Sequence, residues 1–342
     1  MSQFISEPSA YVIAAAASHL VAGGLVTFPT ETVYGLGADA CNAMGVARIY
    51  EVKGRPADHP LIVHMASMQR MGDWAEEIPE YAISLARDFW PGPMTLVLKR
   101  SSLAKDFITG GQETVGVRVP DHVVALALLE AFENLGGKGI AAPSANRFGQ
   151  VSPTIAAAVA EEIGEFLDSA DKIIDGGACA VGVESTIIDC TGDVPRILRP
   201  GAITVAMIEV STGQIVVKAS NTFVDAQVAT ADTPISNLIS SAGTEIRVSG
   251  SLENHYAPAA KVLLCETPTP GQGFIAHANM ETPAGVVRLA SPQSDEEFAQ
   301  ILYSALREAD AQGLAEVVVM QPIGIGIAVA IRDRLARAAN GR

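Results

Sequence analysis

Cysteine and positive charge are both scarce in this chain of 342 residues, and each shortage argues against a class of protein. The four cysteines, Cys41, Cys179, Cys190 and Cys265, are widely separated and form no CxxC pair. This spacing is not that of a disulfide scaffold or of a structural zinc site. We therefore expect reduced thiols and a cytoplasmic protein.

Lysine and arginine together number 23 against 38 aspartates and glutamates, which gives a net charge of -15. A protein that holds nucleic acid on a broad basic surface needs clustered cations, so we expect no stable nucleic-acid binding. The first cation is Arg48, so the apolar stretch 11–22 lacks the charged start of a signal peptide and is too short to span a bilayer. We expect no membrane association, and a local basic pocket remains compatible with this composition.

The two common nucleotide-binding loops are also missing. There is no GxxxxGK[ST] loop and no GxGxxG fingerprint, since Gly324 and Gly326 are followed by no third glycine. His59 and His64 are five residues apart, and no cysteine-rich ligand set accompanies them. We expect no metal site built from protein side chains, and any nucleotide must be held by a different kind of loop.

What is present is a globular composition, with 49% hydrophobic and 18% charged residues in a chain long enough for two domains. Apolar β-type runs alternate with helical stretches up to about residue 208, and a second such pattern begins near 259. The predicted fold class is α/β, with a twisted mixed sheet and helices plus a smaller C-terminal α/β (Rossmann-like) domain. The predicted division is a first domain at 1–208, a linker at 209–258 and a small domain at 259–342.

Hydrophobic periodicity and turn signals predict the individual elements. Strands are expected at 24–28, 61–63, 94–98, 115–119, 139–142, 172–174, 186–189, 261–265, 285–289 and 316–320. Helices are expected at 11–22, 42–53, 77–89, 120–132, 295–312 and 328–339, with another that starts at the Ser-Pro-Thr of 152–154.

The most informative stretch runs from residue 23 to residue 64. Hydroxyl side chains follow its first strand, a Gly-Leu-Gly turn is expected at 35–37, and Asn42 is placed to cap a helix that ends at Gly54. Lys53 and Arg55 at the helix exit can simply compensate the helix dipole. Together with the hydroxyls and with His64, they also form the pattern of a pocket for a polyanion.

This stretch resembles the signature of the threonylcarbamoyl-AMP synthase family, which has a YrdC-like fold. The matching segments are PTET at 29–32, KGRP at 53–56 and PL at 60–61, followed in order by VGVRVP at 115–120, PSAN at 143–146, SPT at 152–154, ESTI at 184–187, ILRPG at 197–201 and HYAP at 255–258. The resemblance covers most of the chain and includes the C-terminal extension of the longer family branch.

The resemblance implies roles for these positions. Lys53 and Arg55 are suited to stabilise the charge that develops on a leaving pyrophosphate. The residues implied to contact ATP are Arg55, His59, Thr114, Ser144, Ser152, Arg199 and Tyr256. Those implied to form the L-threonine shell are Thr32, His64, Arg118, Ala142 and Ser185. The linker that carries Tyr256 is expected to return over the active site.

Each local pattern also has a purely structural interpretation. Arg118 lies inside an apolar strand and needs a carboxylate partner, which either the protein or a ligand can supply. The PSAN segment at 143–146 and the EST segment at 184–186 can be ordinary turns. Arg199 can pair with a surface acid, and Tyr256 can be an aromatic residue that packs between domains. The sequence leaves these alternatives open.

The family reaction joins L-threonine, bicarbonate and ATP into threonylcarbamoyl-adenylate, with release of pyrophosphate. ATP is then a substrate, we expect Mg²⁺ to accompany it, and no tightly bound cofactor is expected. In the family, the adenylate passes to a separate transferase complex that modifies adenosine in tRNA, so such a partner is implied by the resemblance.

Two other functions stay open. The first is an RNA-binding or regulatory module that uses the same concave site for an RNA end, and the acidic composition weighs against it. The second is a carbamoyl transferase, as in larger proteins that contain a YrdC-like domain, although neither an acylphosphatase-like nor a zinc-finger segment is present. ATP consumption that depends on threonine separates all three.

Overall fold

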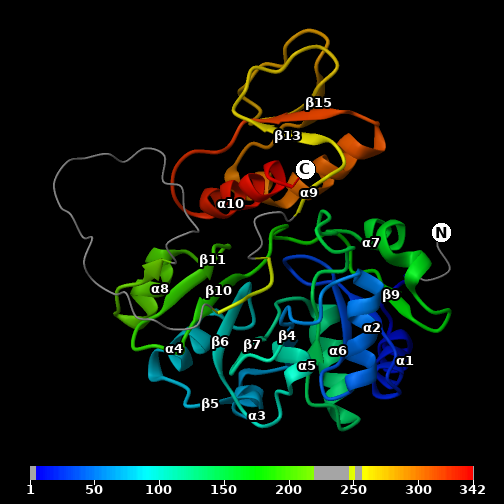
Figure 1. Cartoon of the computed structure of the whole chain (residues 1–342), viewed down its shortest axis with the longest axis vertical. Helices are drawn as coiled ribbons and strands as arrows, with labels where there is room; N and C mark the ends of the chain where they lie inside the picture. Colours follow the sequence, from blue (N-terminus) through cyan, green and yellow to red (C-terminus); the bar gives the residue numbers. More distant parts are fainter. Residues whose placement is uncertain (1–4, 219–245, 251–255, 342) are drawn as a thin grey trace.

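The structure is a computed structural model, and it describes residues 5–218, 246–250 and 256–341. The linker expected at 209–258 therefore falls partly outside the described residues, and so does His255 of the HYAP segment. Figure 1 shows a large unit built from the first part of the chain and a smaller unit formed by its last part.

The large unit is organised around a mixed sheet, as predicted. Among the described residues, twelve strands join it in the order β1-β9-β2-β3-β8-β4-β7-β6-β10-β11-β12, and β5 pairs with β6. The strands are β1 (Ile5–Ser6), β2 (Val26–Phe28), β3 (Gly35–Asp39), β4 (Ile62–His64), β5 (Ala75–Glu76), β6 (Met94–Arg100), β7 (Thr114–Arg118), β8 (Ile140–Ala141), β9 (Lys172–Ile174), β10 (Thr186–Asp189), β11 (Arg196–Arg199) and β12 (Val217–Lys218).

The turn predicted at 35–37 is wrong. These residues begin β3, which pairs antiparallel with β2. A Cβ on Gly37 would lie 2.6 Å from Cγ2 of Ile140 and 2.8 Å from Cε1 of Phe28. The glycine therefore marks a close approach of neighbouring side chains inside a sheet, which a pattern of Gly-x-Gly does not distinguish from a turn.

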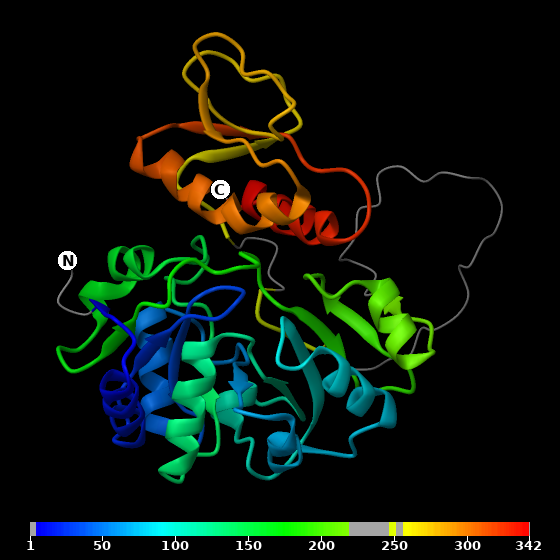
Figure 2. The same ribbon diagram turned by 180° about the vertical axis from the view of Figure 1, so that it is seen from behind.

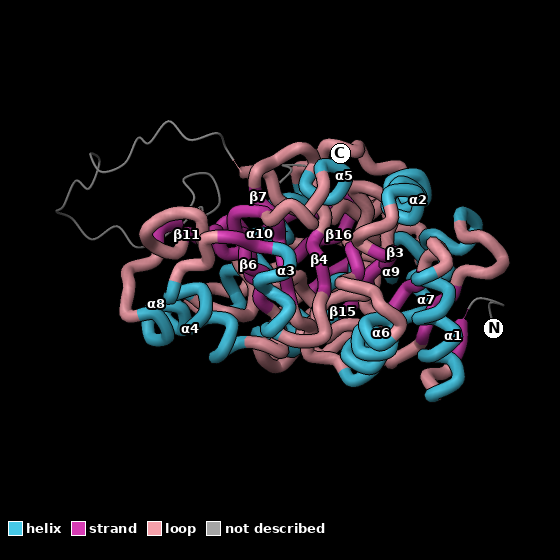
Figure 3. Tube along the Cα trace, turned by 90° about the horizontal axis from the view of Figure 1, so that it is seen from below, coloured by secondary structure: helices cyan, strands magenta, loops and turns pink. Residues whose placement is uncertain are grey.

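Helices cover this sheet. They are α1 (Ala10–Val21), α2 (Ala43–Lys53), α3 (Met71–Trp74), α4 (Glu80–Phe89), α5 (Asp106–Thr109), α6 (Val123–Asn134), α7 (Ala156–Ile163) and α8 (Val205–Thr212), with short 3-10 turns at Met68–Arg70 and Gly164–Phe166. Helix α1 packs against α6 near one end of the sheet, and α4 packs against α8 near the other (Figure 3). As predicted, Asn42 caps α2 and Gly54 ends it in the left-handed conformation with φ 60°.

Three predicted helix starts differ from the structure by at least three residues. The helix expected from residue 77 begins at Glu80, the one expected from residue 120 begins at Val123, and the one expected at the Ser-Pro-Thr segment begins only at Ala156. The carbonyl groups of Pro153 and Thr154 instead accept hydrogen bonds from the backbone N–H groups of Tyr34 and Cys179. The segment 152–154 is thus held in an extended form by neighbouring loops.

The small unit contains a parallel sheet with the strand order β13-β16-β14-β15. Its elements are β13 (Lys261–Leu264), β14 (Gly273–Ile275), β15 (Val287–Ala290), α9 (Asp295–Ala311), β16 (Glu316–Val319) and α10 (Ile327–Ala339). Strand β14 was not predicted. The two predicted helices are present and differ by one residue at the end of α9 and at the start of α10.

Helices α9 and α10 lie between the small sheet and the large unit, and the view from behind in Figure 2 shows the same arrangement. One hydrophobic cluster contains Val33, Val151 and Val183 of the large unit together with Phe298 and Leu302 of α9. The two units therefore share a core. The predicted domain division stays a prediction, and the large sheet continues past residue 208 to β12.

Candidate active site

A pocket of about 520 Å³, measured with its opening to solvent, lies where several strands of the large sheet end. The residues that line it are Thr30, Thr32, Val33, Gly35, Arg55, Ile62, His64, Arg118, Ala142, Pro143, Ser144, Glu184, Ser185, Arg199, Ser249, Gly250 and Tyr256. The structure thus brings together nine of the predicted site residues from segments spread over two thirds of the chain.

Three buried arginines dominate the chemistry of this pocket. Arg55 follows α2, Arg118 ends β7 and Arg199 ends β11, and their exposed fractions are 7%, 4% and 3%. Buried cations need carboxylates or other acceptors around them, and a pocket that holds three of them favours an anionic ligand.

Only part of the Arg55 guanidinium is hydrogen-bonded to the described residues. Its Nη2 donates to the carbonyl of Pro60 at 3.0 Å and to Oγ of Ser249 at 3.1 Å. Its Nε has no hydrogen-bond partner among the described residues. Burial lowers the pKa of Arg55 to about 10, so the group is still charged at neutral pH. A phosphate is the kind of ligand that would satisfy it.

Arg118 forms an ion pair with a carboxylate of the protein, which is one of the two partners that its place in an apolar strand allows. Its Nη2 lies 2.6 Å from Oε1 of Glu31, and both side chains are buried. Its Nη1 donates to Oγ1 of Thr32 at 3.0 Å, and that hydroxyl lies 2.9 Å from Oγ1 of Thr30. The guanidinium is held by one side of the pocket, while its Nε has no hydrogen-bond partner among the residues described.

Arg199 and Ser185 form a joint wall of the pocket. Arg199 donates through Nε and Nη2 to the carbonyl of Ser185, at 3.1 and 3.0 Å, and through Nη2 to its Oγ at 3.1 Å. The same hydroxyl lies 2.8 Å from Oγ1 of Thr95, and Nη1 of Arg199 donates to the carbonyl of Ser249 at 2.8 Å. Arg199 is therefore an interior group of the site, and none of its partners among the described residues is a surface acid.

His64 at the end of β4 is almost completely buried and faces the pocket beside Ala142. Burial, reinforced by the charge of Arg118, lowers the pKa of His64 to about 3. The imidazole is therefore neutral at physiological pH. A neutral ring can donate or accept one hydrogen bond without adding to the positive charge of the pocket.

The structure does not bring four predicted residues to the wall of this pocket. Lys53 is buried, and its Nζ donates to the carbonyl of Ser144 at 2.6 Å and to that of Asn146. Burial, and then the charge of Arg55, lower the pKa of Lys53 well below its usual range. Its position is that of a support for the PSAN segment rather than of a group exposed to ligand.

The other three lie in the surroundings. Thr114 lines an adjoining cavity of about 300 Å³, which shares Ile62 and Ser249 with the main pocket. The ring of His59 packs edge-on against Phe148, with 5.3 Å between their centres. Ser152 is buried, and its Oγ donates to Oε1 of Glu184 at 2.7 Å.

Tyr256 combines the two roles that its sequence position left open. It lines the pocket and is almost fully buried, with a left-handed φ of 64°. Its ring stacks on Tyr303 of α9 at 5.8 Å, and Cζ of Arg334 lies 5.3 Å from the ring centre. The tyrosine therefore packs between the two units and closes one side of the pocket.

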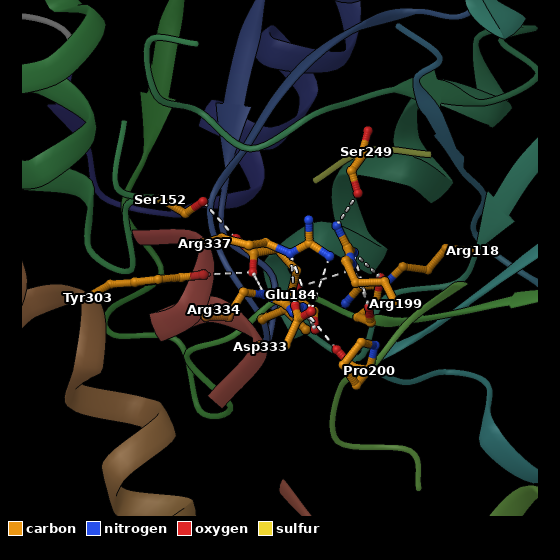
Figure 4. Close-up of polar contacts among 12 residues, drawn as sticks. Arg118, Ser152, Glu184, Arg199, Pro200, Ser249, Tyr303, Asp333, Arg334 and Arg337 are labelled. Atoms are coloured by element: carbon orange, nitrogen blue, oxygen red, sulfur yellow. Dashed lines mark hydrogen bonds and ion pairs between the residues drawn. The ribbon is translucent and has the colours of Figure 1, made fainter. Parts of the chain in front are cut away.

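Sequence reasoning did not single out Glu184 or its partners Tyr303 and Arg334. The polar contacts around this carboxylate are drawn in Figure 4. Its neighbours in the ESTI segment gave the only signal for Glu184. Tyr303 and Arg334 lie on amphipathic helices whose sequence gives no indication of a buried polar contact.

The fold and the pocket define an α/β protein of two units, in which a mixed sheet carries a pocket lined by three buried arginines. A family model of the Sua5–YciO–YrdC type, described as telomere recombination, matches residues 18–201. A second model, described as the C-terminal domain of threonylcarbamoyl-AMP synthase, matches residues 203–340. The chain belongs to the threonylcarbamoyl-AMP synthase family of enzymes, which confirms the resemblance found in its motifs.

Individual relatives agree with this assignment over nearly the full length. A threonylcarbamoyl-AMP synthase of Pyrococcus abyssi is 41% identical over 96% of this chain and 94% of its own length. One from Bacillus subtilis is 38% identical over 96% and 93%. The crystal structure of P. abyssi Sua5 complexed with L-threonine covers 99% of this chain and 98% of its own, with a TM-score of 0.84 and 38% identity.

Proposed function

We propose that the chain converts L-threonine, bicarbonate and ATP into threonylcarbamoyl-AMP, pyrophosphate and water. The observation that carries this proposal is the set of three buried guanidinium groups, Arg55, Arg118 and Arg199, in one pocket. A carbamate formed from the threonine amine must attack the α-phosphate of ATP, so two anions have to meet. Fixed cations offset their repulsion and the charge that develops on the leaving pyrophosphate.

On the threonine side, Arg118 binds the carboxylate in this proposal. The hydroxyls of Thr32 and Ser185 and the neutral ring of His64 are the candidates for the threonine hydroxyl, and Ala142 leaves room for the methyl group. The relative solved with L-threonine supports a threonine site. A site that hydrogen-bonds the hydroxyl rejects an amino acid without it more strongly than one without the methyl group.

On the ATP side, Arg55 and Arg199 face the phosphates, helped by the hydroxyl of Ser144, and Tyr256 covers the nucleotide. The adjoining cavity with Thr114 is the candidate for the nucleoside. Lys53 acts by holding the PSAN segment that presents Ser144. Direct contacts of His59 and Ser152 with ATP stay predictions.

Mg²⁺ is proposed to enter with ATP, held by phosphate oxygens and water. In the part of the chain that the structure describes, no group of three His, Cys, Asp or Glu side chains is placed to hold a metal ion.

A tRNA-modifying transferase is proposed as the consumer of the adenylate, and the cytoplasm as the compartment. No helix within the described ranges is long and apolar enough to cross a membrane.

Pyrophosphate release from ATP and bicarbonate tests the proposal. We expect release with L-threonine, weaker release with L-serine, and almost none with L-valine or without an amino acid. Arg55→Ala should reduce the threonine-dependent rate at least tenfold, and Arg87→Ala, which alters an arginine with a side chain 66% exposed, is the matched control. Pyrophosphate release that does not depend on threonine would refute the proposed synthase activity and favour carbamoyl transfer or RNA binding.

A further inference from the structure

One polar cluster joins the small unit to the wall of the pocket. Glu184 lines the pocket, and its carboxylate accepts hydrogen bonds from OH of Tyr303 at 2.8 Å, Nε of Arg334 at 2.7 Å and Oγ of Ser152 at 2.7 Å. Tyr303 belongs to α9 and Arg334 to α10 (Figure 4). Two of the three donors therefore come from the C-terminal unit.

Arg334 also contacts the residue that follows β11, the second strand on this side of the pocket. Its Nη2 donates to the carbonyl of Pro200 at 3.0 Å, directly after Arg199. Glu184 precedes β10 and Pro200 follows β11, and these two strands are antiparallel neighbours. One guanidinium thus holds both chain ends that present Ser185 and Arg199 to the pocket.

The packing at these chain ends leaves little freedom. A Cβ on Gly201 would lie 2.4 Å from the backbone nitrogen of Thr186, so the two segments are in close contact. Arg199 and Ser185 are joined by three hydrogen bonds of their own. A shift of Glu184 or Pro200 must therefore move the groups that face the ligand.

Arg334 itself is not available to a ligand. Its side chain is fully buried, and its Nη1 lies 2.5 Å from Oδ2 of Asp333, which Arg337 also contacts. Its part in the site is one of support.

We propose that Tyr303 and Arg334 are positioning residues for the reaction, so that the C-terminal unit completes the active site by fixing Glu184, Ser185 and Arg199. This inference rests on the proposed function. It assigns to the small unit a task in substrate binding that the large unit cannot perform alone, because among the described residues the large unit supplies only one of the three donors to the Glu184 carboxylate.

The test compares Tyr303→Phe and Arg334→Lys with Arg307→Ala in the full-length chain. Arg307 also lies on α9 and bridges the two units through Glu162 and the carbonyl of Val151, but it does not line the pocket. KM values for L-threonine and ATP, kcat and the melting temperature are measured for all variants by threonine-dependent pyrophosphate release.

We expect Tyr303→Phe to raise at least one of the two KM values about three- to tenfold, the effect of one lost hydrogen bond, and Arg334→Lys to raise it further. Arg307→Ala should lower the melting temperature and leave both KM values unchanged. If Arg334→Lys does not fold, Tyr303→Phe decides, since it removes only one hydroxyl. Unchanged KM values in an active Tyr303→Phe enzyme would overturn the inference, whereas wild-type protein without threonine-dependent release would overturn the proposed function.

Discussion

Lys53 and Arg55 leave the same helix end but occupy different environments. Between them Gly54 adopts a left-handed φ of 60°, which turns the chain and sends the two side chains apart. Lys53 reaches the carbonyls of Ser144 and Asn146, and Arg55 reaches the pocket. Two neighbouring cations with one predicted role thus have two different roles in our proposal.

Replacement of Lys53 by methionine tests its supporting role. Lys53→Met keeps much of the side-chain volume but leaves two buried carbonyls without a donor, which costs about 1–3 kcal/mol of unfolding free energy. Urea denaturation should show this loss, and the KM for ATP should rise. Lys138→Met, at an exposed position, should change neither quantity. A large fall in kcat with unchanged stability and KM would instead make Lys53 a direct partner of the phosphates.

His64 predicts a pH dependence of stability. Its pKa is about 3 in the folded chain and 6.5 in the unfolded one, so between these values the unfolded state binds the extra proton. The free energy of unfolding should therefore fall as pH falls through this window, by up to about 1.4 kcal/mol per pH unit for this one group. In urea titrations between pH 7 and pH 5, His64→Asn should show a shallower dependence than the wild type. Parallel curves would contradict a buried neutral imidazole.

At the scale of elements, the packing of β3 depends on Gly37, which belongs to a Gly-Leu-Gly segment that resembles a turn. A methyl group on Gly37 would meet Ile140 and Phe28 inside the sheet, so Gly37→Ala should destabilise the protein by about 1–3 kcal/mol. The matched control is Gly72→Ala in α3, where a Cβ would have no neighbour within 4 Å. That change should be neutral or slightly stabilising. Equal midpoints in urea for both variants would contradict the close packing at Gly37.

At the scale of the whole molecule, the shared cluster should couple the unfolding of the two units. Val183 of the large unit is fully buried among residues of α9 and α10. We expect one calorimetric transition for the wild type. Val183→Asp places a charge in this apolar contact and should split the transition into two. Val210→Asp, on the exposed face of α8, should leave a single transition, and two transitions in the wild type would show that the units unfold independently.

Sequence patterns predicted the elements whose signals are local. Asn42 and Gly54 marked both ends of α2, and the apolar runs at β9 and β10 gave those strands at their observed bounds. Nine of the predicted site residues line one pocket, because the fold brings together strand ends, the end of α2 and the segment that carries Tyr256. Strand β14 was not predicted, although it is as long as β9.

The sequence by itself determined the α/β class, the family and the arginines that an anion-binding pocket needs, because capping, periodicity and motif spacing are properties of neighbouring residues. Only the tertiary structure decided that Lys53 supports a loop and that Glu184 is held by Tyr303 and Arg334, which lie 119 and 150 residues further along the chain. Such contacts depend on how α9 and α10 dock onto the large sheet. Their energy comes from burial and from hydrogen bonds between distant segments, and no local pattern encodes which atoms will meet.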